Sequence, residues 1–413
     1  MSSAATARRV RSSSRWLNRN VVAMALTSLL SDWGHEMATA ALPGFAAVLA
    51  IGPFALGAIE GVADALSSAV KLWAGRWSDR SRHRKAVATS GYVLTGASKA
   101  LFALAHGWPI ILAGRAVGWL GRGIRGPVRD AMLAESVPVA QVGRAFGFHR
   151  AGDTIGALLG PATTLVLLAW RQPHEATYRT IFVLTLVPGL LSTLVFGAWT
   201  EDPRPRLRPA IVPTVDETSS RVSSSAYHRF LSGVALFGLA DFAPTLLMLR
   251  AGAVLTPVMG AGAAATAAVA LYTLRNAVEA VAAYPAGALS DRLPRTVVLA
   301  GGYAVLVVVA AGAAWPVASL VFFAALFALS GVLAGVQDVV EGASIAALVP
   351  VHRRGSAYGA LAAINGVGDF CSSIVTGLLW TWWSAAGAFG VAAALAVAGS
   401  VVMATVPRSR IAR

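Results

Sequence analysis

The chain has 413 residues, of which 56% are hydrophobic and 13% are charged, and its formal net charge is +15. Ordinary soluble domains carry about 25% charged residues, so this composition excludes a soluble globular protein and indicates that most of the surface faces lipid. Membrane topology and attraction to anionic lipid explain the positive charge, so we expect a lipid bilayer and no nucleic acid as partner. Cys371 is the only cysteine, which excludes disulfides and a cysteine-built metal site.

Apolar windows about 20 residues long recur along the chain, and each is long enough to cross some 30 Å of hydrocarbon. Because lipid cannot satisfy the polar groups of loops or open sheets, we predict that these spans are helices. The first apolar run is too long for the core of a signal peptide, so we predict a retained helix there. The twelve predicted spans are residues 21–48, 54–75, 87–106, 108–134, 143–168, 178–199, 229–251, 263–286, 296–314, 317–345, 356–381 and 383–406.

A polar stretch between the sixth and seventh spans divides the twelve into two sets of six. Its prolines and serines have the composition of a linker. The predicted layout is a basic tail over 1–20, a six-helix bundle over 21–199, a linker over 200–228, a second six-helix bundle over 229–406 and a tail over 407–413. The sequence therefore predicts an all-α membrane protein.

Positive charge is distributed unevenly between the two ends of the spans. Arginines cluster before the first span, after the second span, in the linker and at the end of the chain, whereas the opposite loops carry only Arg171, Arg179 and Arg250. By the positive-inside rule, we predict that both termini and the linker are cytoplasmic.

The two sets of spans repeat each other at a fixed distance. Residues 75–80 (GRWSDR) correspond to residues 287–292 (GALSDR), and the Val-Pro-Val of residues 137–139 corresponds to that of 349–351, both at an offset of 212. Coincidental matches would scatter over many offsets. The repeat therefore predicts two halves with the same order of elements, as in transporters that rock about a central site.

The loop after the second span carries a motif. Gly75-x-x-x-Asp79-Arg80-x-x-x-Arg84 and its second copy after the eighth span resemble the signature loop of the major facilitator superfamily (MFS). The resemblance covers essentially the whole chain. It implies a bacterial secondary transporter of the cytoplasmic (inner) membrane, with twelve transmembrane helices in two pseudo-symmetric bundles, whose charged loop residues act in gating. The gating residues expected from this motif are Gly75, Asp79, Arg80, Arg84, Gly287, Asp291, Arg292 and Arg295.

The fifth span carries a second motif. Gly147, Gly156, Gly160 and Pro161 are similar to the pattern of drug/proton antiporters in this superfamily, although Thr164 and the residue after it replace the usual closing Gly-Gly. The similarity implies export and a gating role for these four residues. The alternative is that closely spaced glycines only form a helix-packing face.

Three ionisable side chains interrupt the first span at spacings i, i+3 and i+4: Asp32, His35 and Glu36. They share one helical face near mid-membrane, so they must face the bundle interior. Two close carboxylates do not both ionise at low cost, and an imidazole can relay a proton. We predict that they couple transport to protons, with Asp241 of span seven as their partner. A divalent-metal site on the three first-span residues and purely structural pairing stay open as alternatives.

Positions that correspond at the offset of 212 residues are polar in both span two and span eight, which favours a cavity lining over accidental burial. Alternatively, Arg275 and Glu279 form an ion pair with each other within span eight. In span four, arginines project from one side of the helix. A guanidinium group in a dry cavity suits a substrate that carries a carboxylate or phosphate group. The predicted substrate-binding residues are Glu60, Asp64, Arg115, Arg122, Tyr272, Arg275, Asn276, Glu279, Asp338 and Asp369.

These features predict a proton-coupled secondary transporter that works by alternating access, favoured as an exporter (antiporter) of a small organic solute. The runner-up is a proton-driven importer of an organic anion, and a divalent metal or cation exporter comes third. A lipid-handling or sensory membrane protein is the alternative from another class. The sequence has no phosphate-binding loop, no GxSxG elbow and no HExxH pair, so we expect no cofactor and no enzyme activity. We expect a proton gradient to be the energy source and the protein to be a monomer.

Overall fold

A computed structural model describes residues 16–78, 83–138, 141–203, 224–349 and 354–406. The predicted tails and linker lie largely outside these residues. Within the described part of the chain, the regular structure is helical. The helices are α2 (Arg19–Val48), α3 (Pro53–Ser78), α4 (Arg84–Ala103), α5 (Trp108–Glu135), α6 (Val142–Arg171), α7 (Glu175–Leu184), α8 (Leu186–Trp199), α9 (Ser224–Gly238), α10 (Pro244–Met259), α11 (Ala261–Arg292), α12 (Arg295–Ala314), α13 (Leu320–Leu348), α14 (Arg354–Trp382) and α15 (Ala385–Ala404).

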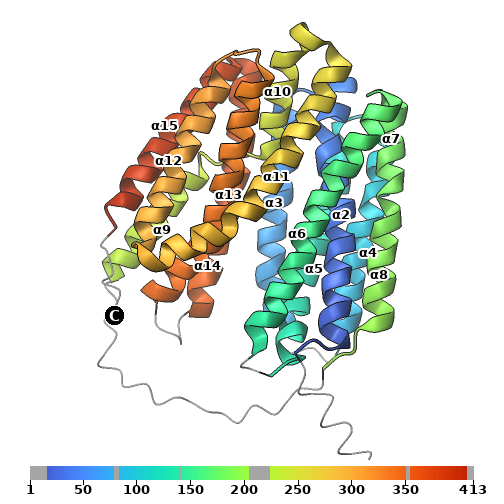
Figure 1. The fold of residues 1–413 in the computed structure, drawn as a ribbon, viewed down its shortest axis with the longest axis vertical. Coiled ribbons are helices and arrows are strands. Elements are labelled where there is room, and N and C mark those ends of the chain that lie inside the picture. Colours follow the sequence, from blue (N-terminus) through green and yellow to red (C-terminus); the bar gives the residue numbers. More distant parts are fainter. Residues whose placement is uncertain (1–15, 79–82, 139–140, 204–223, 350–353, 407–413) are drawn as a thin grey trace, which may run out of the picture.

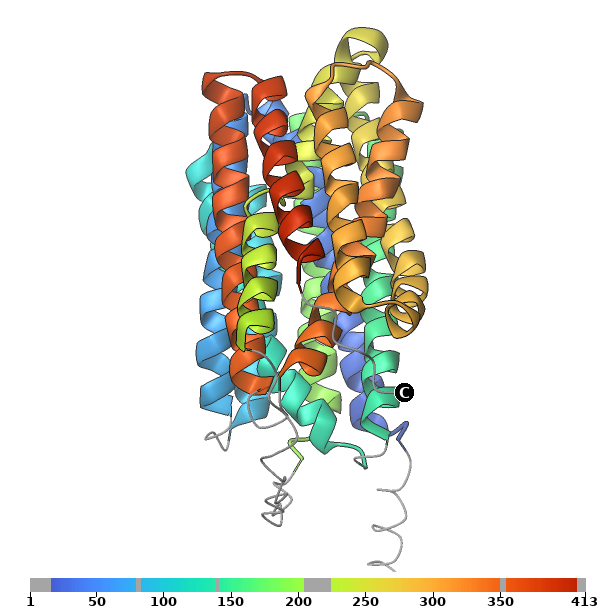
Figure 2. The same cartoon turned by 90° about the vertical axis from the view of Figure 1, so that its left-hand side faces the viewer.

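The helices form two bundles that lie side by side. Figure 1 shows α2 to α8 in one bundle and α9 to α15 in the other, and Figure 2 shows that most helices run along the long axis of the molecule. This arrangement confirms the predicted all-α fold of two helical bundles. Six helical segments are long and apolar enough to cross a membrane by length and composition alone. Helices such as α5 and α11 carry charged side chains that lower their hydropathy.

Two predicted spans are interrupted in the structure. The span predicted at 178–199 consists of α7 and α8, which meet at Thr185. The span predicted at 229–251 is not one continuous helix: α9 ends at Gly238, and α10 begins at Pro244. Because proline has no N–H and forces the residue before it out of the helical region, Ala243 is extended, with φ −56° and ψ 137°. The helix α9 begins at Ser224, within the stretch 200–228 predicted as a linker.

Each bundle is held together by close helix contacts. Gly152, Gly156 and Gly160 of α6 lie against the backbone of α2, where a side chain would not fit. In the second bundle, the rings of Phe237 and Tyr303 stack with their centroids 3.6 Å apart. The glycines of α6 permit its backbone to approach that of α2, and such small residues are the usual basis of close helix packing in membranes.

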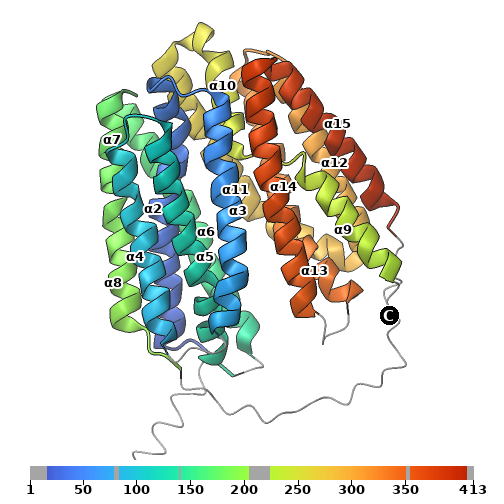
Figure 3. The ribbon, with the colours of Figure 1, turned by 180° about the vertical axis from the view of Figure 1, so that it is seen from behind.

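The bundles touch most closely at one end of the molecule. We call the end where α2 begins and α8 ends the tail end, and the opposite end the loop end. At the loop end, the backbone N–H of Phe54 donates to Thr381 Oγ1 at 3.0 Å. A Cβ added to Gly377 of α14 would lie 2.5 Å from the carbonyl oxygen of Pro53. Figure 3 shows α3 and α14 side by side along this seam, with the bundles apart toward the tail end.

Candidate functional site: a charged cavity between the bundles

A cavity of about 980 Å³ lies between the bundles and is lined by residues of both. The loop-end contacts between α3 and α14 described above, at Pro53, Phe54, Gly377 and Thr381, lie beyond the residues that line it. All fourteen residues predicted for proton coupling and substrate binding line it: Asp32, His35, Glu36, Asp241, Glu60, Asp64, Arg115, Arg122, Tyr272, Arg275, Asn276, Glu279, Asp338 and Asp369. The structure brings them together in one place, while their individual roles stay predictions.

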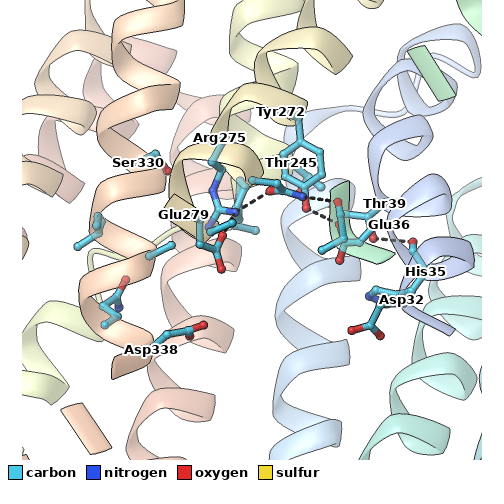
Figure 4. A pocket seen from close by; sticks show the side chains of 18 of the residues that line it. Asp32, His35, Glu36, Thr39, Thr245, Tyr272, Arg275, Glu279, Ser330 and Asp338 are labelled. Carbon is cyan, nitrogen blue, oxygen red and sulfur yellow. Dashed lines mark hydrogen bonds and ion pairs between the residues drawn. The ribbon is translucent and has the colours of Figure 1, made fainter. Parts of the chain in front are cut away.

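The three predicted proton-coupling residues of α2 face the cavity but have different partners. Asp32 Oδ1 lies 3.0 Å from Arg122 Nη1 and 3.6 Å from Arg125 Nη2. Glu36 Oε2 accepts a hydrogen bond of 2.8 Å from the hydroxyl of Tyr272 in the other bundle. Figure 4 shows this bond crossing from α11 to α2.

His35 is buried, with 3% of its surface exposed, and its ring meets the edge of Trp119 at a centroid distance of 5.3 Å. Its Nδ1 has no hydrogen-bond partner among the described residues. In the described part of the chain, no group of three or more His, Cys, Asp or Glu side chains is placed to hold a metal ion. The divalent-metal alternative therefore gains no support from the geometry.

Arg115 does not stand free in the cavity. Its Nη2 lies 2.6 Å from Glu60 Oε2, its Nη1 donates to Thr39 Oγ1 at 2.9 Å, and both charged side chains are 4% exposed. Trp119, one turn along α5, lies beside the guanidinium groups of Arg115 and Arg122, at 5.7 and 5.3 Å from its ring centroid. These arginines are thus fixed by acids and by an aromatic ring.

The wall from the second bundle is built in the same way. Arg275 Nη1 donates to Glu279 at 2.8 Å and to Asn276 at 3.0 Å. Arg275 and Glu279 therefore pair with each other, which was the alternative to a substrate-binding role. Asn276 also donates to the carbonyl oxygen of Ala157 in the first bundle at 3.2 Å. Asp241 lies in the break between α9 and α10 and accepts a hydrogen bond of 2.9 Å from Gln337.

Two carboxylates remain without partners. The side chains of Asp64 on α3 and Asp369 on α14 make no hydrogen bond or ion pair within the described residues, although both line the cavity. Their helices belong to different bundles and pack closely, since a Cβ at Gly61 would lie 2.7 Å from the carbonyl oxygen of Phe370. An unpaired carboxylate in a largely buried position favours binding of a proton or of another cation.

The charge balance of the whole cavity is acidic. Nine carboxylate side chains and four arginines line it. Each of the four arginines is already bound to a carboxylate: Arg115 to Glu60, Arg122 to Asp32, Arg275 to Glu279, and Arg150 across the bundles to Asp338. Carboxyl groups therefore outnumber the lining arginines, and none of these four arginines is left unpaired to receive an anion.

The gating residues of the first signature loop that the structure describes, Gly75 and Arg84, are not among the residues that line this cavity. Gly75 belongs to α3, and Asp79 and Arg80 fall outside the described residues. Arg84 binds Glu135 through two hydrogen bonds of 2.9 and 2.8 Å and lies 3.4 Å from Asp202. These contacts stay within the first bundle, so this arginine joins α4 to its neighbours and does not join the two bundles.

The second copy of the signature loop shows fewer contacts. Gly287 lies close to Val339 of α13, with 3.3 Å between an added Cβ and the valine Cγ1. Asp291, Arg292 and Arg295 make no ion pair with the described residues, and Arg295 Nε is buried without a partner among them.

The glycine motif of the fifth span is divided between two environments. Gly156 and Gly160 pack against α2, whereas Gly147 has no atom within 4 Å of an added Cβ. Pro161 lies inside α6, next to Gly160. The packing interpretation fits Gly156 and Gly160, and the gating role of all four stays a prediction.

Some cavity residues are not among the predicted site residues, although the sequence offers Arg150 and Asp153 as counter-charges for the arginines of span four. Asp153 and Arg150 of α6 and Gln337 of α13 line the cavity as well. Asp153 stands four residues after His149, a spacing that places both on one helical face and was available as a signal. Gln337 is uncharged, and nothing in its sequence context indicated a contact with Asp241.

Two helical bundles around a charged central cavity define a multi-pass membrane transporter. The profile of the Major Facilitator Superfamily matches residues 24–274 and 230–412 of the chain. The protein therefore belongs to this superfamily and is a transporter, not an enzyme.

Comparison with known proteins gives relatives along almost the whole chain. An uncharacterised MFS-type transporter of Methanocaldococcus jannaschii is 29% identical over 372 residues, which are 89% of either chain. An uncharacterised protein of Mycobacterium tuberculosis is 26% identical over 368 residues, covering 88% of this chain and 87% of that protein.

Solved structures share the fold at low sequence identity. The nucleoside transporter NupG, in a mutant form, is 12% identical, with a TM-score of 0.77 over 94% of this chain and 99% of its own. A D-xylose-proton symporter is 14% identical, with a TM-score of 0.74 over 96% of this chain and 99% of its own. At such identities the likeness establishes the fold alone.

Proposed function

We propose that this protein is a proton-coupled antiporter that exports a small organic cation across the bacterial cytoplasmic (inner) membrane. The observation that carries the proposal is the charge balance of the cavity, where carboxylates outnumber arginines and every arginine is paired. A cationic solute is favoured by such walls, and an anion is repelled by them.

Antiport follows from competition for the same carboxylates. Asp64 and Asp369 are without partners among the described residues, and each accepts either a proton or the cationic group of a solute. Binding of one then disfavours binding of the other, so the bundles return with protons after releasing the solute. A proton gradient is the energy source in this scheme, and no cofactor is needed.

The same geometry weighs against the alternatives. A proton-driven importer of an organic anion needs an unpaired guanidinium, whereas Arg115 and Arg122 are bound to Glu60 and Asp32. A lipid-handling protein needs an apolar passage, whereas charged side chains line this one.

Orientation completes the proposal. If both termini are cytoplasmic, as the positive-inside rule predicts, the tail end faces the cytoplasm. The cavity is closed at the loop end by contacts such as that of Phe54 with Thr381, so the structure corresponds to an inward-facing state. Alternating access then requires the α3 and α14 seam to open while the tail end closes, in a single chain that acts as a monomer.

The test uses the purified full chain in proteoliposomes that enclose a pH-sensitive dye and an acidic buffer. We expect tetraphenylphosphonium, added outside, to make the lumen more alkaline as protons leave in exchange. Benzoate and Mn²⁺ serve as the organic-anion and divalent-metal probes and should produce no such change. The double variant D64N/D369N should lose the response, while the control E175Q, altered at an exposed residue, should keep it. Proton entry with benzoate, or an unaltered response in the double variant, would overturn the proposal.

A further inference from the structure

A second buried polar network lies in the first bundle, beside the cavity. Ser28 of α2 and His149 of α6 are 0% and 3% exposed, and Ser28 Oγ lies 2.8 Å from His149 Nε2. Arg129 Nη1 of α5 donates to the same Ser28 oxygen at 2.8 Å. The other ring nitrogen, His149 Nδ1, lies 3.5 Å from Asp153 Oδ2 on the next turn of α6. Three helices thus contribute to one chain of contacts.

Arg129 has only donors to offer, so the oxygen of Ser28 accepts from it. In the arrangement where the Ser28 hydroxyl donates to His149 Nε2, the ring proton sits on Nδ1 and is directed at Asp153. Arg129 is itself held by Asp130, with two contacts of 3.0 and 2.9 Å, which keeps the donor in place.

The order of atoms, serine to histidine to aspartate, is that of a nucleophilic triad. Here it cannot serve that chemistry, because Ser28 is fully buried and its oxygen is already engaged by Arg129. Only Asp153, at the other end of the chain of contacts, reaches the cavity.

Asp153 differs from Asp32 in what surrounds its carboxylate. Asp32 Oδ1 lies 3.0 and 3.6 Å from two guanidinium groups. Asp153 has a neutral imidazole on one oxygen, and its Oδ1 is buried with no partner among the described residues. An unsatisfied buried carboxylate oxygen is stabilised when it carries a proton or meets a water molecule.

Several charges face the pair formed by His149 and Asp153. These groups come from three helices and carry both signs of charge. The groups concerned are Asp32 of α2, Arg125 and Arg129 of α5, and Arg150 of α6 itself.

We propose that Asp153 is a proton-binding carboxyl of the transport cycle, and that His149, held by its hydrogen bond with Ser28, is its positioning residue. This inference rests on the proposed proton coupling and assigns part of it to a side chain other than Asp32. The proton reaches Asp153 from the cavity, which it lines, and is held between α2 and α6.

Infrared spectroscopy of the purified full chain across a pH series tests the assignment with protons as the only probe. Besides the bands expected from Asp64 and Asp369, we expect wild type to show one further titrating carbonyl band of a protonated carboxyl, which is absent in D153N and persists in D32N. H149Q should move the midpoint of that band by about one pH unit or more. H149N retains a donor near the Nδ1 position and should move it less. The control H106Q, altered at an exposed histidine, should leave the midpoint unchanged. If the titrating bands of D153N equal those of wild type in number and intensity, or if the midpoint is unmoved in H149Q, the inference is overturned.

Proteoliposomes separate this inference from the proposed function. If wild type and D153N both exchange protons for tetraphenylphosphonium, antiport stands and the role of Asp153 is wrong. If wild type moves no protons, antiport fails, and the infrared titration still reports whether Asp153 binds a proton. Under our account, wild type exchanges, and D153N loses about tenfold or more of the proton response, within the usual range for coupled sites.

Discussion

The ion pair of Arg115 and Glu60 shows how much of the cavity depends on single residues. Both side chains are 4% exposed, and Glu60 Oε1 has no partner among the described residues. Taking two charges out of water is costly, and the pair is favourable only while both partners are present. Such a pair fixes the wall of the cavity more than it stabilises the fold.

Replacing Arg115 by methionine should therefore destabilise the protein more than removing both charges. Loss of one partner from a buried ion pair costs about 3–5 kcal/mol, because the remaining charge is uncompensated. We expect R115M to unfold at a clearly lower temperature in detergent, and the double variant R115M/E60L to recover a large part of the loss. A double variant no more stable than R115M would contradict this description of the pair.

Sequence spacing located the polar residues of each helix but not their partners. Asp32, His35 and Glu36 share a face of α2 as predicted, since the helical period fixes which residues lie together. That Asp32 binds Arg122 while Glu36 binds Tyr272 depends on how α5 and α11 are placed, which no local pattern specifies.

At the scale of helices, α6 and α2 form the closest pair of the first bundle, and their contact depends on glycines. A Cβ at Gly156 would collide with the carbonyl oxygen of Leu29 and lie 3.0 Å from the amide nitrogen of Trp33. Both neighbours are backbone atoms, so the strain can only be relieved by moving a helix.

Substitution of Gly156 by alanine should destabilise the protein by about 1–3 kcal/mol, the usual cost of overpacking. Gly147 is the matched control, because nothing lies within 4 Å of its added Cβ. We expect G156A to lower the unfolding temperature in detergent and G147A to leave it within the error of the measurement. Equal effects of the two variants would mean that the glycines serve a purpose other than packing.

Apolar length predicted the helices well, because each has to cross the same thickness of hydrocarbon. The break between α9 and α10 was not predicted. The apolar residues on both sides of Pro244 continue the pattern of a single span. The break exposes backbone groups to the cavity and holds Asp241 there. Non-helical backbone is tolerated at this depth only because the surrounding helices shield it from lipid.

At the scale of the whole molecule, few polar contacts join the bundles across the cavity. Tyr272 donates to Glu36, Asn276 donates to the carbonyl of Ala157, and Arg150 pairs with Asp338. Each contact stabilises the state that is open at the tail end. Rocking has to break or rearrange them, so they set the balance between the two states.

Removal of one of these contacts should shift that balance. Y272F deletes the hydroxyl that binds Glu36, and a net loss of about 1 kcal/mol changes the ratio of states roughly fivefold. We expect spin labels at Arg144 and Asp291, at the tail ends of α6 and α11, to report a smaller population at long distance in Y272F. Unchanged distance distributions would show that this bond does not favour the open state.

The central claim is that protons and an organic cation compete for the same carboxylates between the bundles. Titration calorimetry of the purified chain with tetraphenylphosphonium, repeated in buffers of different ionisation enthalpy, counts the protons exchanged on binding. We predict the release of at least about one proton per bound cation, from a site with raised proton affinity, and a loss of that release in D64N/D369N. Binding that releases no proton, or takes protons up, would contradict the account.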